Sequence, residues 1–414
     1  MRLSLRSIPL VLASCSLASL ALFATRGETV PLYAARQGVM CAQCHFDPNG
    51  GGPRNAYGFT FEKNRHSTDA ETGGMFKDLD LSNRVGETMP IYFGVDHRLM
   101  ILADDVANPP SGVDRFGFYN MESNLSIAFQ PHEKLTLVYT TDGLNGPNIA
   151  SNSPRVTREA WGMLGIGSSH YVKVGQFRLP FGLRLDDHTV GSRNGFLDFQ
   201  TRQSVLPFDP RLTDQGVEFG GNMNSTFGRI ALTNGASNVL QGLNKTRTRA
   251  DAVSAKLGYN RPAFQAGVSG YDEWQPVFAG GDKARIDRWG LYGLTHFERW
   301  SFLGELVSGT DKIDGATGAK SAKNVLGAFA EADMQWNRAL NFRVRFDHME
   351  TDRNADLTLR ELGSFSRYAL EGEIVPVPFA EIRWTLRLID PSAPKTPAGG
   401  DNEKQAYIQL HFAY

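Results

Sequence analysis

Apolar and polar residues alternate one by one through most of the last three quarters of the chain. Segment 381–388 is the clearest case: its four apolar residues share one face of an extended strand, and Glu381, Arg383 and Arg387 lie on the other. Such a strand fits a closed barrel in a membrane, where the apolar face meets lipid and the charged face lines water. The alternation therefore predicts a membrane-spanning antiparallel β-barrel.

The same pattern places further charged residues on the inner face of the predicted barrel. Arg343 and Arg345 alternate with apolar residues, and so do Glu371 and Glu373. We expect these side chains to line the pore and set its electric field, although ordinary paired charges of a pore wall are the simpler interpretation. The predicted pore-lining residues are Arg343, Arg345, Glu371, Glu373, Glu381, Arg383 and Arg387.

Sixteen segments carry the alternation, and an even number is typical of bacterial outer-membrane barrels. Connections after even-numbered strands are short, as at 131–133 and 167–169, whereas those after odd-numbered strands are long, as at 179–212 and 310–321. This predicts short periplasmic turns, long external loops and an N-terminal segment on the periplasmic side. The predicted strands are 91–104, 115–130, 134–142, 156–167, 170–178, 213–222, 226–233, 250–259, 263–273, 284–296, 300–309, 322–335, 339–349, 365–376, 379–389 and 403–414.

Composition agrees with an all-β chain. The 43 glycines and 11% aromatic residues suit strands and turns better than helices. The last predicted strand ends on Tyr414, and a terminal aromatic residue resembles the insertion signal of bacterial outer-membrane proteins. A soluble β-sandwich or propeller is the alternative fold. The formal net charge of −1 gives no reason to expect a nucleic-acid partner.

Residues 1–27 have the features of an export signal. Arg2 and Arg6 precede an apolar, serine-containing run, and small residues near Ala24 provide a cleavage site. A transmembrane anchor and a lipid-modified Cys15 are the alternatives. The apolar run is short for an anchor and continues past Cys15, so an exported and cleaved chain is the favoured prediction.

The segment Cys41-Ala42-Gln43-Cys44-His45 has the spacing of a c-type haem attachment site. Each thiol can add to one vinyl group of a haem, and the adjacent His45 can then bind the iron. A redox-active thiol pair and a zinc site are the alternatives, but the mature chain has no second cysteine pair and no βαβ context around this one. The sequence therefore predicts one covalent haem c.

The second axial ligand is left open. His66 lies far enough along the chain to fold back over the opposite haem face, Met75 is the next candidate, and a vacant position also fits. Met40 is too close to the attachment site. Residues 28–89 are few for an independent domain, so we expect this haem segment to depend on the barrel predicted for 90–414.

Three short pieces resemble signatures of the phosphate-selective porin family. They are segments 175–182, 213–217 and 232–235, and they occur in the same order as in that family. The resemblance implies a sixteen-stranded porin. Separately, the connection 179–212 is long enough to fold inward and narrow a pore. The resemblance does not imply phosphate selectivity, because the ladder of lysines and arginines of that family is not identifiable here.

A haem segment followed by a porin resembles the fused monohaem cytochrome–porins of the outer membrane, which are known from iron-oxidising bacteria. Residues 33–38 are similar to the lead-in of that family, and Pro48 and 57–61 are similar to its tail after the haem. The glycine-rich stretch 49–53 departs from that pattern. The resemblance implies that the haem carries electrons between an extracellular donor or acceptor, most concretely ferrous iron, and a periplasmic c-type cytochrome.

Two other functions fit the same residues. One is a solute-selective porin whose haem segment is a plug or a sensor. The other is a peroxidase-like haem enzyme with an open sixth iron position. We expect an electron conduit rather than a classical enzyme. The expected location is the bacterial outer membrane, with the haem segment at the periplasmic mouth or in the lumen and with membrane lipid around the barrel.

Overall fold

The computed structural model describes two short helices and eighteen strands. The described residues are 41–67, 81–86, 89–105, 115–141, 158–184, 195–196, 202–203, 213–235, 250–261, 264–276, 283–314, 320–350, 352–353, 365–391 and 403–414. The elements are α3 (Cys41–Cys44), α4 (Ala56–Lys63), β1 (Ile91–Asp105), β2 (Arg115–His132), β3 (Leu135–Thr141), β4 (Glu159–Ile166), β5 (His170–Phe177), β6 (Gly195–Phe196), β7 (Arg202–Gln203), β8 (Asp214–Met223), β9 (Thr226–Thr233), β10 (Ala252–Arg261), β11 (Phe264–Pro276), β12 (Lys283–Phe297), β13 (Trp300–Asp314), β14 (Lys320–Asn337), β15 (Leu340–Glu350), β16 (Phe365–Val377), β17 (Ala380–Pro391) and β18 (Glu403–Ala413).

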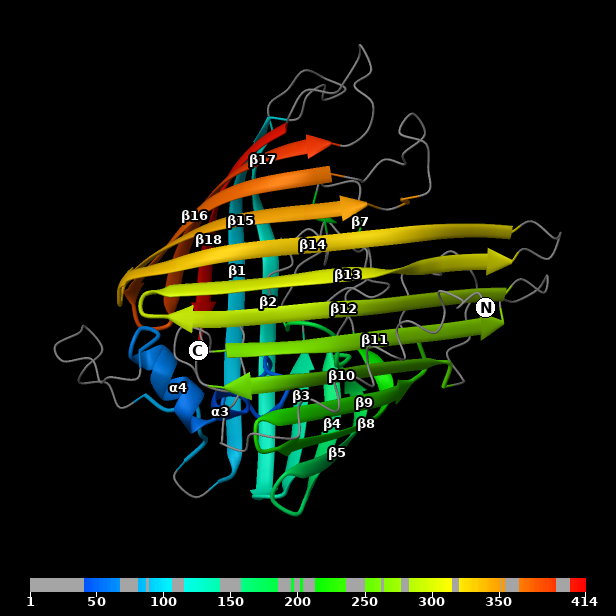
Figure 1. Cartoon of the computed structure of the whole chain (residues 1–414). Coiled ribbons are helices and arrows are strands. Elements are labelled where there is room, and N and C mark those ends of the chain that lie inside the picture. Colours follow the sequence, from blue (N-terminus) through cyan, green and yellow to red (C-terminus); the bar gives the residue numbers. More distant parts are fainter. Residues whose placement is uncertain are drawn as a thin grey trace, which may run out of the picture.

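Sixteen of these strands form one closed barrel (Figure 1). Each pairs antiparallel with its neighbours in the chain, and β1 pairs with β18 to complete the circle. Strands β6 and β7 form a separate two-stranded sheet within the connection between β5 and β8. The prediction of a sixteen-stranded antiparallel barrel is confirmed, and each predicted strand overlaps one barrel strand.

One predicted connection is wrong in length. A loop is expected at 310–321, but β13 continues to Asp314 and β14 already begins at Lys320. The connection between these two strands is therefore shorter than predicted. Their ladder continues through the pair Ile313–Ser321. The backbone pairing of β13 and β14 extends beyond the residues that alternate between apolar and polar. Strand ends predicted from hydrophobicity alone therefore make both strands too short here.

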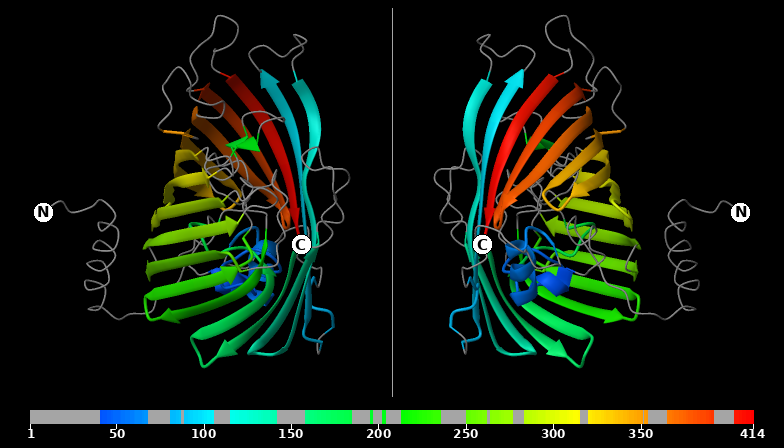
Figure 2. Two further views of the ribbon diagram at one scale, coloured as in Figure 1. Left: turned by 90° about the vertical axis from the view of Figure 1, so that its right-hand side faces the viewer. Right: turned by 90° about the vertical axis from the view of Figure 1, so that its left-hand side faces the viewer.

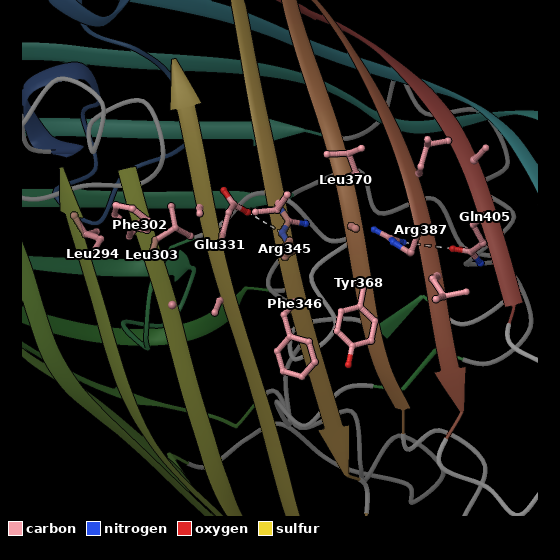
Figure 3. Close-up of a pocket in the computed structure, with 18 of the residues that line it drawn as sticks. Leu294, Phe302, Leu303, Glu331, Arg345, Phe346, Tyr368, Leu370, Arg387 and Gln405 are labelled. Carbon is pink, nitrogen blue, oxygen red and sulfur yellow. Dashed lines mark hydrogen bonds and ion pairs between the residues drawn. The ribbon is translucent and has the colours of Figure 1, made fainter. Parts of the chain in front are cut away.

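The two faces of the barrel wall have opposite chemistry. Leu386 is 53% exposed and Leu370 is 45% exposed, whereas their chain neighbours Arg387 and Glu371 are buried. Figure 3 shows the two kinds of side chain on β14–β18, where an apolar hollow is lined mainly by outward-facing residues such as Tyr368. Exposed apolar residues around buried charged ones invert the arrangement of a water-soluble protein. This surface fits lipid outside and a polar lumen inside.

Residues 41–67, which we call the plug, lie inside the short-turn end of the barrel (Figures 1 and 2). Phe46 belongs to a buried cluster with Trp161 of β4 and Phe177 of β5. Phe59 of α4 meets Phe379 and Tyr414, with ring centroids 5.2 Å away in each case. The plug therefore packs on both the lumen wall and the end of the last strand.

The first residues of the long connection after β5 also lie in the lumen. Phe181 is buried against inward-facing apolar side chains of the barrel. The Ser254 hydroxyl donates to the Pro180 carbonyl at 2.9 Å, and the Lys256 ammonium donates to the Gly182 carbonyl at 2.5 Å. The described start of the predicted inward loop therefore does turn into the barrel.

Several sequence predictions fall outside the described residues. They concern the signal 1–27, Cys15, Met40 and Met75. Among the helices that the structure does describe, none has the length and apolar character needed to cross a membrane.

The outer face gives a test of lipid contact. We expect Leu386→Arg, in the middle of β17, to destabilise the barrel in lipid vesicles by about 2–4 kcal/mol, because an arginine there meets hydrocarbon. Met223→Arg lies at the end of β8 beside a short turn, and should cost only about 0–1 kcal/mol. Urea unfolding in vesicles measures both, and equal costs would contradict this membrane placement.

Candidate functional site

The predicted haem motif, residues 41–45, begins with one helical turn on the plug. Helix α3 consists of Cys41–Cys44 alone, so the two cysteines stand three residues apart in one helical turn. Cys44 is half-buried. His45 follows directly and pairs with Arg54 in an isolated β-bridge. The side chain of Cys41 lies outside what the structure describes.

Two residues hold α4 against this turn. The Asn55 side chain donates to the Gln43 carbonyl at 2.9 Å and accepts from the Gly58 backbone N–H at 3.0 Å, while the Asn55 backbone N–H donates to the Cys44 carbonyl at 2.9 Å. A Cβ on Gly58 would come within 2.2 Å of that same carbonyl oxygen. Asn55 therefore caps α4 and ties it to the haem motif, and only glycine fits at position 58.

The environment of Cys44 fits a thioether better than a metal thiolate. Burial raises the pKa of the Cys44 thiol to about 11, so the free thiol is neutral near pH 7 and the reactive thiolate is disfavoured. A thioether bond to a haem carries no charge and has no such cost on burial. Among the described residues, no cluster of three or more histidine, cysteine or acidic side chains has the arrangement of a metal site.

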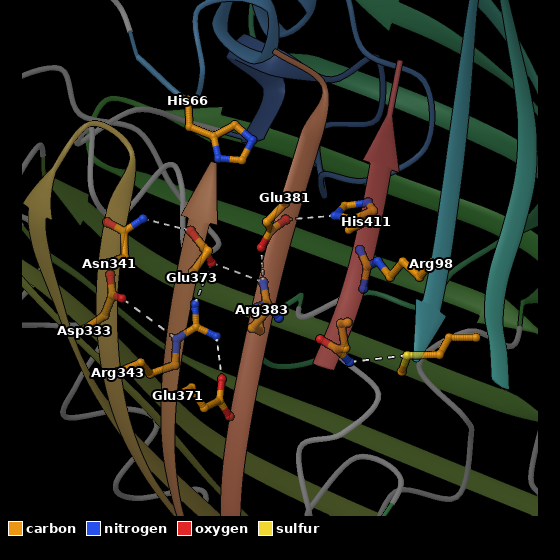
Figure 4. Close-up of polar contacts among 12 residues, drawn as sticks. His66, Arg98, Asp333, Asn341, Arg343, Glu371, Glu373, Glu381, Arg383 and His411 are labelled. Atoms are coloured by element: carbon orange, nitrogen blue, oxygen red, sulfur yellow. Dashed lines mark hydrogen bonds and ion pairs between the residues drawn. The ribbon is translucent and has the colours of Figure 1, made fainter. Parts of the chain in front are cut away.

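His66 lies just after α4 and is buried where the plug faces the lumen wall (Figure 4). Its Nε2 is 3.0 Å from Oε1 of Glu62, and its ring stacks on Phe61 with centroids 5.9 Å apart. Burial by itself would raise the pKa of Glu62, but the charges of His66 and Arg54 lower it to about 2. Glu62 is therefore a carboxylate that orients the His66 ring.

A polar tip of the plug, residues 47–53, reaches into the lumen wall. Both carboxylate oxygens of Asp47 accept from Nζ of Lys173, at 3.1 and 3.3 Å, and Lys173 is completely buried. The amide of Asn49 donates to Glu218 at 2.9 Å. Burial favours a raised pKa for Asp47, but Lys173 and Arg184 hold its pKa below the ordinary value. The tip is thus joined to the barrel by buried charges.

The glycine-rich stretch shapes this tip. Gly50, Gly51 and Gly52 all have positive φ angles, of 87°, 69° and 66°, which favour glycine. A Cβ on Gly51 would lie 2.4 Å from the guanidinium of Arg184, which itself contacts Asp47 at 3.4 Å. Residues 49–53, where the sequence departs from the cytochrome–porin pattern, therefore lie at the contact between the plug and the inward loop.

The predicted pore-lining residues are buried in the barrel, Arg383 partly, and six of the seven join one network, five of which Figure 4 labels. Arg343 meets Glu371 at 2.9 Å and Glu373 at 3.2 Å. The other contacts of this set are Arg345–Glu371 at 3.5 Å, Arg383–Glu373 at 3.3 Å and Arg383–Glu381 at 2.7 Å. Arg387 donates to the Tyr407 hydroxyl at 2.7 Å.

The network continues across the closing seam of the barrel. His411 of β18 lies 2.9 Å from both Glu381 of β17 and Asp96 of β1. It therefore links the first strand to the last two. His411, Asp96 and Glu331, which pairs with Arg345 at 2.7 Å, were missed by the sequence analysis, although all three lie on polar faces of predicted strands.

Five further residues of the site were also missed. They are Asp47, Asn49, Lys173, Arg184 and Glu218. The alternation in β5 and β8 marks Lys173 and Glu218 as inward-facing. Nothing in the sequence indicates that the plug reaches them, because the partners are 126 and 169 residues apart.

Comparison with solved structures gives the same architecture. The anion-selective porin from Comamonas acidovorans aligns with a TM-score of 0.56 at 11% identity, over 78% of this chain and 99% of that one. The outer-membrane channel DcaP of Acinetobacter baumannii aligns with 0.57 at 10% identity, over 81% and 100%. Salmonella typhi OmpF aligns with 0.53 at 10% identity, over 78% and 97%. The fold is that of the outer-membrane porins. No family model and no curated protein matches the sequence.

Gly58 allows a test of the packing of the plug. We expect Gly58→Ala to push α4 away from the Cys44 carbonyl, to destabilise the plug by about 1–3 kcal/mol, and to increase protease cleavage within residues 41–67. Thr60→Ala, on the exposed side of the same helix, is the matched control. Cleavage that is equal in both variants would contradict the close contact.

Arg343 allows a test of the lumen network. Arg343→Ala leaves two buried carboxylates without their main cation and should lower the free energy of unfolding by about 3–5 kcal/mol. Arg285 is 60% exposed in its pair with Asp272, so Arg285→Ala should cost less than about 1 kcal/mol. Urea unfolding in detergent micelles measures both. If Arg343→Ala changes the free energy of unfolding by no more than Arg285→Ala, water hydrates the carboxylates as well as Arg343 does, and the predicted role of the network is wrong.

Proposed function

We propose that the chain is an outer-membrane porin-type barrel whose plug carries one covalent haem c and transfers electrons through the barrel mouth. One observation carries the proposal. The Cys-x-x-Cys-His turn lies on a plug seated within a porin-type barrel and joined to its wall by the buried pair Asp47–Lys173. A haem motif on a flexible tail outside the barrel would not have supported this function.

The residues present fit the attachment of a haem. Cys41 and Cys44 would hold its two vinyl carbons, and His45 would bind the iron, with His66 or Met75 as the second ligand. A bound haem supplies a one-electron iron couple. Asn55 holds the attachment turn in place, as its contacts with Gln43 and Cys44 indicate.

The position of the plug suits a conduit. The apolar band of a barrel is about 25 Å tall, so a group buried in hydrocarbon would be insulated from both aqueous phases. A haem within the mouth can meet a periplasmic c-type cytochrome on one side and a small solute on the other. We propose ferrous iron as the most concrete extracellular donor, in keeping with the resemblance to the cytochrome–porins.

A solute-selective porin with a haem-bearing plug is the second candidate, and the fold comparisons favour it. The neighbouring structures are named as porins and channels, and one is named as anion-selective. In this alternative the barrel conducts solutes, and the haem segment acts as a plug that blocks the pore or as a sensor. The two candidates share the architecture and differ in whether the haem exchanges electrons with an external species.

A redox titration of the purified protein separates the candidates. The electron conduit predicts a c-type visible spectrum that is reduced within seconds by added ferrous iron and reoxidised by a periplasmic cytochrome. Cys44→Ala, which removes one thioether, should give a spectrum shifted toward single-bond attachment or lose the haem. A c-type haem that exchanges electrons with no external donor or acceptor would contradict the electron conduit. The solute-selective porin with a haem-bearing plug would then be the remaining candidate.

A further inference from the structure

We propose that Lys173 and Arg184 form an anion-binding site inside the pore, specific for small carboxylates and similar anions, and that the plug closes the pore by filling this site with its own Asp47 carboxylate. The site belongs to the barrel and to its inward loop. Asp47 is its tethered occupant. This proposal does not depend on what the haem does.

The two described contacts between the wall and the Asp47 carboxylate are both with cations, Lys173 and Arg184. Lys173 Nζ lies 3.1 and 3.3 Å from the two oxygens of Asp47, and Arg184 Nη1 lies 3.4 Å from one of them. The remaining donor is the backbone N–H of Asn49, at 2.8 Å, which belongs to the plug itself. Removal of the tip would therefore leave Lys173, which also pairs with Glu218, and Arg184, which also pairs with Glu159, facing the space that the Asp47 carboxylate had filled.

Lys173 is held in position for this role. It is completely buried on β5, and its ammonium lies 5.3 Å from the ring centroid of Trp161 and 5.0 Å from that of Phe177. Its other ionic partner is Glu218 of β8, at 3.2 Å. Such a fixed ammonium binds an anion without first having to be ordered, which favours tight binding.

Arg184 brings the second cation from the inward loop. The same loop is tied to the far wall, where Ser254 donates to the Pro180 carbonyl and the backbone N–H of Leu183 donates to Glu305 at 3.1 Å. Glu159 of β4 also meets Arg184, at 3.5 Å. Loop, wall and plug tip therefore converge on one carboxylate, so an anion that binds there competes directly with the closed position of the plug.

Conductance of the full-length, haem-loaded protein in planar bilayers tests this proposal. The wild type should conduct little. Asp47→Ala should raise the mean conductance roughly tenfold, since charge-assisted hydrogen bonds are among the strongest that a side chain makes. Under a potassium chloride gradient the open variant should favour chloride over potassium. Added sodium acetate should reduce its chloride current and leave the wild type unchanged.

The double variant Asp47→Ala/Lys173→Gln is the matched control. It should conduct as well as Asp47→Ala and lose both the preference for chloride and the effect of acetate. Asp47→Asn keeps the shape of the side chain and serves the same comparison if the alanine variant does not fold, as judged by its heat-dependent mobility on a gel. Wild-type conductance in both folded variants, or an open pore that favours potassium, would overturn the proposal.

The two proposals fail separately. If ferrous iron does not reduce the haem but Asp47→Ala opens a pore that favours chloride, the electron conduit is lost and the anion site stands. If iron reduces the haem and Asp47→Ala stays closed, the anion site is lost and the conduit stands.

Discussion

Everything in this structure depends on the closure of the sheet between β1 and β18. In hydrocarbon each unpaired backbone N–H or C=O group costs several kcal/mol, so a sheet that spans a membrane cannot have a free edge. The register that closes the barrel runs from the pair Asp96–Ala413 to the pair Asp105–Lys404. These residues are some three hundred positions apart, and their pairing gives the chain an inside and an outside.

The same seam supports the plug. Tyr414, the residue after β18, packs against Phe59 of α4 and against Phe93 of β1. His411 joins β18 to Asp96 and Glu381 on either side. The helix that follows the haem motif therefore rests where the barrel closes, and the position of the plug is a consequence of that closure. A short segment with little core of its own gains a rigid site in this way.

Charge inside the barrel has two different uses. On β15–β17, Arg343 pairs with Glu371 and Glu373, and the contacts continue through Arg383 and Glu381 to His411 of β18. On β5, Lys173 pairs across to Asp47, a residue of the plug. The first wall stabilises the barrel, whereas the second joins the barrel to a separate segment. This difference explains why the pore chemistry that we propose lies at β5 and the inward loop rather than among the arginines of β15–β17.

The sequence alone determined the sixteen strands and their faces, and it predicts the haem motif. Alternation with a period of two is a local property, so Arg343 could be assigned to the lumen from its neighbours, and Cys41, Cys44 and His45 form a motif five residues long. Only the tertiary structure decided where the haem motif lies and what it touches. Asp47 meets Lys173 and Asn49 meets Glu218 because closure of the barrel brings distant strands around the plug, and no local pattern records a contact across 126 or 169 residues.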